Sequence, residues 1–172
     1  MQTRDLSPTF GSALGAQLLD IFVRDPSQTV TSTVPPFASR NYSIASGSAW
    51  SSRIEVQGFA GPVFVDPAGR SLGSVAVSAS AISRFITLIV PKSALGQPSH
   101  GWIFSVVLTG QDGFSQDQAR GFAATPQPFQ FGVCAPGGTS PICSVNPATV
   151  PKAIDVLTPA GVNQAAELVS GL

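Results

Sequence analysis

The sequence is poor in charged residues, and this argues against one large class of partners. Only 9 of its 172 residues are Lys or Arg, 9 are Asp or Glu, and the formal net charge is zero. Nucleic acid is bound by clustered basic residues that displace counterions from phosphates, whereas the basic residues here are scattered singly along the chain. We therefore expect no nucleic-acid partner.

Long apolar runs are also missing. A transmembrane helix needs roughly 18 apolar residues in succession, and the apolar segments of this sequence are only long enough for strands. We therefore expect no insertion into a membrane. Residues 1–6 lack both the basic and the apolar region of a signal peptide, so we expect that a secreted form would be exported as part of a longer precursor.

Histidine is nearly absent, which limits the catalytic chemistry. His100 is the only one, and the chain has no Gly-x-Ser-x-Gly elbow, so the sequence disfavours a hydrolase triad. Glycoside hydrolysis needs only a pair of carboxylates, but it usually needs a larger cleft than a small sandwich provides. The acidic residues that could supply such a pair are Asp20, Glu55, Asp66, Asp112 and Asp117. On balance we expect a protein that is not an enzyme.

The chain has only two cysteines, Cys134 and Cys143, which bracket a loop rich in Gly and Pro. Such a loop turns back on itself easily, so a local disulfide is sterically feasible, and it would indicate an oxidising compartment. Zinc would need a second Cys or His pair, so we favour the disulfide over a metal or two free thiols. Calcium takes about six to eight oxygen ligands, and Asp112 and Asp117 fall far short of that number. We expect neither a metal nor a cofactor.

What the sequence does contain is a series of strand-length segments separated by Gly, Pro, Asp and Ser. Residues 17–24 carry apolar side chains on both faces, whereas residues 50–58 alternate between apolar and polar positions. The predicted strands are residues 17–24, 50–58, 63–66, 73–80, 84–90, 101–110 and 127–134, with an edge strand or loop at 28–34 and one helical turn at 92–96. This pattern predicts an antiparallel two-sheet β-sandwich over residues 1–145 and an irregular tail with one short helix over 146–172.

Aromatic and planar polar side chains are the candidates for a ligand-binding site, because rings can stack and guanidinium, carboxylate and amide groups can form hydrogen bonds. The candidates are Trp50, Tyr42, Arg53, Glu55, Gln57 and Phe114. For each, a structural alternative stays open: the aromatic rings could pack in the core or against a turn, and the polar side chains could form an ordinary solvated strand face with a cross-strand ion pair. Trp102 shares a strand face with Phe104, which favours a place in the core.

Several blocks of the sequence, in order, carry a recognisable pattern, among them Ile-Thr-Leu-Ile-Val-Pro-Lys-Ser-Ala-Leu-Gly at residues 86–96. The others are residues 17–23, 53–58, 101–114, 123–129 and 158–162. Together these blocks resemble the C-terminal domain of glucodextranase and its relatives. The resemblance implies a DOMON-like, jelly-roll-like sandwich. Relatives of this kind have further strands before residues 4–8, so the resemblance also implies that N-terminal strands are missing from this chain.

The resemblance further implies a role. Such modules are appended to secreted glucodextranases, glucoamylases and pullulanases, and resemble surface-layer-homology modules. The expected function is therefore non-catalytic carbohydrate binding or cell-surface attachment, outside the cell. Because a pyranose ring offers a C–H face for stacking and hydroxyls for hydrogen bonds, the binding candidates chosen above become the carbohydrate-binding candidates: Trp50, Tyr42, Arg53, Glu55, Gln57 and Phe114. The expected partners are a polysaccharide, either an α-glucan or a cell-wall glycan, and a parent catalytic domain in a longer chain. A structural spacer without glycan affinity is the main alternative, and a piece carrying the parent glycoside hydrolase activity is a weaker one.

Overall fold

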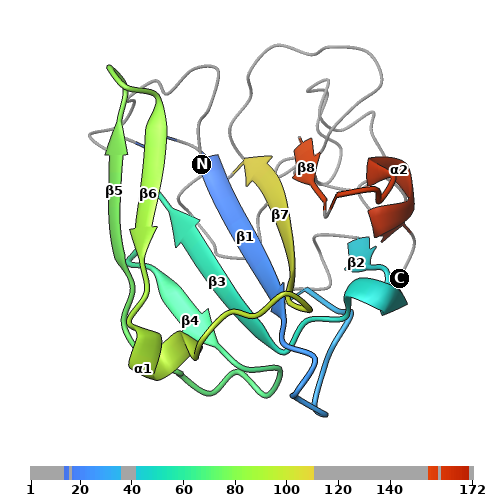
Figure 1. Ribbon diagram of the computed structural model, residues 1–172. Helices are drawn as coiled ribbons and strands as arrows, with labels where there is room; N and C mark the ends of the chain where they lie inside the picture. The colour runs from blue at the N-terminus through green and yellow to red at the C-terminus, as the bar shows by residue number, and fades with distance from the viewer. Residues whose placement is uncertain (1–13, 16, 36–41, 111–154, 159, 171–172) are drawn as a thin grey trace, which may run out of the picture.

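The fold is built around one five-stranded antiparallel sheet. The computed structural model describes residues 14–15, 17–35, 42–110, 155–158 and 160–170. The strands of the sheet are β1 (Gln17–Arg24), β3 (Ser52–Gln57), β4 (Val63–Val65), β7 (Ile103–Gly110) and β8 (Asp155–Leu157). They lie in the order β4-β3-β1-β7-β8, which places β1 at the centre (Figure 1).

The central strand explains the apolar residues on both sides of residues 17–24. β1 pairs with β3 on one side and β7 on the other, so that Ile21 lies opposite both Ile54 and Val106. Leu19 and Phe22, which point to opposite faces, are each only 1% exposed. Full burial of an apolar side chain of this size contributes about 1.5–3 kcal/mol, so β1 anchors the core on both faces of the sheet.

Two smaller antiparallel sheets cover the two faces of the five-stranded sheet (Figure 1). Their strands are β2 (Tyr42–Ile44), β5 (Ala76–Ser80), β6 (Phe85–Ile89) and β9 (Leu168–Ser170). β5 and β6 form a hairpin, and β2 pairs with β9. Leu19 belongs to the apolar cluster under the hairpin, whereas Phe22 belongs to a second cluster that contains Tyr42. The all-β, sandwich-like fold predicted from the sequence is confirmed.

The short helical elements occupy connections. They are the 3-10 turn η2 (Ser46–Ser48) and the helices α1 (Lys92–Leu95) and α2 (Gln164–Glu167). α1 is the predicted helical turn, and it ends at Gly96, whose φ of 89° lies in a region that favours glycine. Residues 28–34 form a loop rather than a strand, with an isolated bridge between Ser32 and Trp50. The strand predicted at residues 127–134 lies outside the described residues.

The C-terminal segment adds strands to both layers. Residues 146–172, which the sequence analysis set apart as a tail, supply β8 to the edge of the large sheet and β9 to the pair with β2. Glu167 ties this segment to the rest of the fold, because its side chain is fully buried and accepts hydrogen bonds from Ser48 Oγ at 3.0 Å and from Ser105 Oγ. Strands of three residues are too short to show alternation in the sequence.

Candidate functional site

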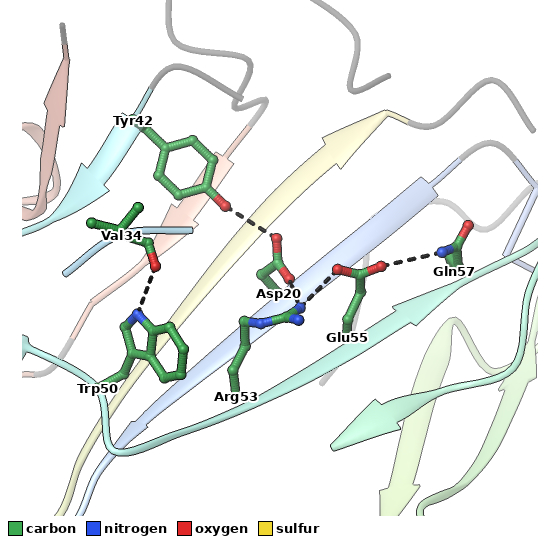
Figure 2. Close-up of polar contacts among 7 residues, drawn as sticks. All are labelled: Asp20, Val34, Tyr42, Trp50, Arg53, Glu55 and Gln57. Carbon is green, nitrogen blue, oxygen red and sulfur yellow. Dashed lines mark hydrogen bonds and ion pairs between the residues drawn. The ribbon is translucent and has the colours of Figure 1, made fainter. Parts of the chain in front are cut away.

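Polar side chains from β1, β2 and β3 form a connected network on one face of the large sheet (Figure 2). In the β1–β3 register Asp20 lies opposite Glu55, and Arg53 follows on the same face of β3. Arg53 Nη1 donates to Asp20 Oδ1 at 2.9 Å and to Glu55 Oε2 at 2.7 Å. Gln57 Nε2 donates to Glu55 Oε1 at 3.2 Å, and the Tyr42 hydroxyl donates to Asp20 Oδ2 at 3.1 Å. Two carboxylates therefore share one guanidinium.

This network is buried. Asp20 is 0% exposed, Glu55 4% and Arg53 5%. These polar side chains are therefore not solvated, because β2 and the residues around Trp50 pack over this face and exclude water. The cross-strand ion pair expected with the solvated strand face is present, between Arg53 on β3 and Asp20 on β1. Ionised groups away from water are tolerated only when they are paired and hydrogen-bonded, so the three charges must hold one another in place.

The same face keeps unused hydrogen-bonding capacity. Arg53 Nε, Gln57 Oε1 and Thr109 Oγ1 are buried without a hydrogen-bond partner. Gln57 and Thr109 both lie opposite Leu18, one on β3 and the other on β7. A buried water molecule or a ligand hydroxyl would find partners in these atoms.

Trp50 and Tyr42 belong to the core. Trp50 is 4% exposed and Tyr42 0%, and both pack against Phe22, with ring centroids 5.8 Å and 6.5 Å apart respectively. The Trp50 indole N–H donates to the Val34 carbonyl oxygen at 3.2 Å (Figure 2). Neither ring offers a face to solvent. Phe114, Cys134 and Cys143 lie outside the described residues.

A second aromatic pair lies at the surface on the opposite face of the sheet. Phe104 on β7 is 42% exposed, and Trp102, just before that strand, is partly exposed. Their ring centroids are 6.1 Å apart and the ring planes are inclined at 39°. Trp102 was expected to lie in the core, but part of its surface is exposed and it belongs to neither core cluster. The β5–β6 hairpin packs on the apolar residues of β1, β3 and β4 and leaves the start of β7 open.

An apolar groove adjoins this aromatic pair. It has a volume of about 320 Å³ and runs between β6 and the strands β1 and β7. The residues that line it are Leu19, Ile21, Ile86, Thr87, Leu88, Phe104 and Val106. Thr87 supplies the one polar side chain among these residues. The sequence did not indicate this site, because the exposure of Phe104 depends on how far the hairpin extends across the sheet.

Metal and membrane chemistry can be tested only on the described part of the chain. Among these residues, no three His, Cys, Asp or Glu side chains gather where they could hold a metal ion. In the same ranges, no helix is long and apolar enough to cross a membrane. The buried carboxylates Asp20 and Glu55 are both bound to Arg53 and do not line the groove.

The described residues thus form an all-β, sandwich-like scaffold with one aromatic pair at its surface. Residues 6–170 match a family described as the C-terminal binding module, SLH-like, of glucodextranase. Because the match covers nearly the whole sequence, the chain belongs to this family, and the resemblance found in the sequence is confirmed. The family consists of binding modules rather than catalytic domains, which fits the expectation of a protein that is not an enzyme. A search of curated proteins finds no match.

Proposed function

We propose that this chain is a non-catalytic carbohydrate-binding or cell-surface-attachment module of a secreted enzyme that degrades α-glucans, of the glucodextranase, glucoamylase or pullulanase type. The observation that carries the proposal is the family match over residues 6–170. In a longer chain, at the cell surface or outside the cell, the module would hold its parent catalytic domain close to a polysaccharide. Tethering of this kind raises the effective concentration of substrate at the catalytic site.

The described surface supports a neutral ligand. The chain has a formal net charge of zero and few ionisable residues, which suits an uncharged polysaccharide better than an anionic polymer. The exposed ring of Phe104 and the partly exposed ring of Trp102 supply an apolar surface on which a pyranose can stack.

The residues chosen from the sequence have a different role in this proposal. Tyr42, Trp50, Arg53, Glu55 and Gln57 are at most 6% exposed, so a sugar could touch them only by entering the buried face. We propose that they hold the scaffold in place, and that contact with the glycan is made elsewhere.

A spacer without glycan affinity is the second candidate. The burial of Trp50 and Tyr42 favours it, since a spacer needs no aromatic residues at its surface. Affinity gel electrophoresis of the 172-residue chain in dextran, pullulan and starch, together with sedimentation with isolated cell wall, separates the two functions. Retardation by a polymer or cosedimentation with cell wall is expected for a binding module. No interaction with any of them, in a protein shown to be folded by circular dichroism, would favour the spacer.

A further inference from the structure

We propose that Trp102 and Phe104 form the glycan-contact surface of this module, and that the ligand is a single α-linked glucan chain. The proposal rests on the proposed function and assigns it a site. The two rings come from residues two apart at the start of β7 and lie on the same side of that strand. This side faces away from the buried Arg53 network.

The relative orientation of the rings favours an α-linked chain. With centroids 6.1 Å apart and planes inclined at 39°, the two rings are not coplanar and cannot together form a flat platform. Successive pyranose rings of an α-linked glucan turn relative to one another, whereas those of an extended β-linked glucan form a flat ribbon. One sugar ring can therefore stack on Trp102 and a neighbouring ring on Phe104 only if the chain bends.

The backbone near Trp102 makes close contact with the indole ring. A Cβ atom at Gly96 would lie 3.6 Å from Trp102 Cη2, so the ring packs against the backbone at this glycine. The Trp102 backbone N–H donates to the Ser99 carbonyl oxygen at 3.1 Å, which closes a turn just before β7. A ring held in this way loses little conformational entropy when a ligand binds, which favours binding.

Hydrogen-bonding groups border the platform. The turn between α1 and β7 carries Gln97, Ser99 and His100, all of them exposed and within five residues of Trp102. Thr87 adds a hydroxyl on the groove side of Phe104. Sugar sites combine an apolar surface for the ring face with a few polar groups for the hydroxyls, and this part of the surface offers both.

The test compares Trp102→Ala and Phe104→Ala with a matched control in affinity electrophoresis. Phe85→Ala is the control, because Phe85 is 45% exposed against 42% for Phe104 but does not line the groove. The polymers are starch, pullulan and dextran, with hydroxyethylcellulose, a soluble glucan whose backbone is β-1,4-linked throughout, for comparison. Loss of a central aromatic contact typically weakens binding at least about tenfold. We expect that loss for both site variants, no change for the control, and preference for an α-glucan.

The possible failures can be told apart. Wild-type binding to an α-glucan that both site variants retain would overturn the site and leave the proposed function intact. Equal or tighter binding to the β-glucan would overturn the argument from the ring tilt. No binding of the wild-type chain to any glucan would overturn this proposal, and cosedimentation with cell wall would then still support attachment. If Trp102→Ala does not fold, Phe104→Ala decides, because Phe104 is 42% exposed and is not part of the buried core.

Discussion

Replacement of Arg53 by Met should destabilise the protein strongly. Arg53 Nη1 lies 2.9 Å from Asp20 Oδ1 and 2.7 Å from Glu55 Oε2, and none of the three side chains is more than 6% exposed. The substitution would leave two buried carboxylates without their cation. Removal of one partner from a buried ion pair costs about 3–5 kcal/mol. Because a domain typically has a free energy of unfolding of about 5–15 kcal/mol, this is a large part of the total.

Arg70→Met is the matched control for this prediction. Arg70 Nη2 lies 2.7 Å from Asp66 Oδ2, but the Arg70 side chain is 80% exposed. Exposed ion pairs contribute about 0–1 kcal/mol. Urea unfolding followed by circular dichroism yields the free energy of unfolding of each variant from the midpoint and the slope. If Arg53→Met lost no more stability than Arg70→Met, the conclusion that the network is buried and mutually dependent would be refuted.

The charge-neutral triple variant Asp20→Asn, Arg53→Met, Glu55→Gln provides the second check on this reasoning. If the loss in Arg53→Met comes from uncompensated buried charge, removal of both carboxylate charges should restore part of it. If the loss comes only from missing contacts of the arginine side chain, the triple variant should be no more stable than the single one. The same urea titration distinguishes these two causes.

Three further predictions test single features of the fold. Tyr42→Phe removes the hydrogen bond to the buried Asp20 carboxylate, and urea titration should show a free energy of unfolding that is lower by about 1–3 kcal/mol. A nearly unchanged free energy of unfolding would indicate that water solvates this carboxylate. Hydrogen bonds from the Arg70 backbone N–H and the Arg70 side chain lower the pKa of Asp66 below its ordinary value of about 3.9. The ionised carboxylate should therefore stabilise the fold above that ordinary pKa, and the stabilisation should be lost as the pH falls through the lower pKa of the folded state. An NMR titration should show the lowered pKa, and Asp66→Asn should abolish this pH-dependent contribution to stability. Gly96→Ala should cost about 1–3 kcal/mol, because φ 89° and ψ −163° suit only glycine, and an unchanged thermal midpoint would contradict the turn geometry.

The strands that alternate or carry long apolar runs could be predicted from the sequence. Residues 17–24 form β1 as predicted, and residues 84–90 contain β6. β2, β8 and β9 were missed, because three residues carry little periodicity and the pairing of these strands is decided by contacts distant in sequence. β4, which is equally short, was predicted at residues 63–66, and it pairs with the nearby strand β3.

The family could be recognised from the sequence, whereas the exposure of individual side chains could not. Arg53, Glu55 and Gln57 alternate with apolar residues, and this pattern normally marks a face in contact with water. A cross-strand ion pair could be expected on such a face, but the pattern does not reveal that the partner of Arg53 is Asp20 or that β2 packs across the face and buries the pair. Phe104 shows the converse, since its apolar strand face predicts burial and the hairpin leaves it exposed.

β7 carries residues of both the buried polar face and the exposed aromatic groove. Ser105 and Thr109 point to the buried polar face, and Phe104 points to the groove on the other side. A ring carried by a strand whose neighbour β1 is fixed by the Asp20–Arg53 ion pair needs little ordering when a ligand binds. The effects of substitutions in the buried network on stability should therefore be separable from the effects of substitutions at the surface on glycan binding. Arg53→Met would lower stability first and binding only indirectly, whereas Phe104→Ala would weaken glycan binding and lower stability less than Arg53→Met does.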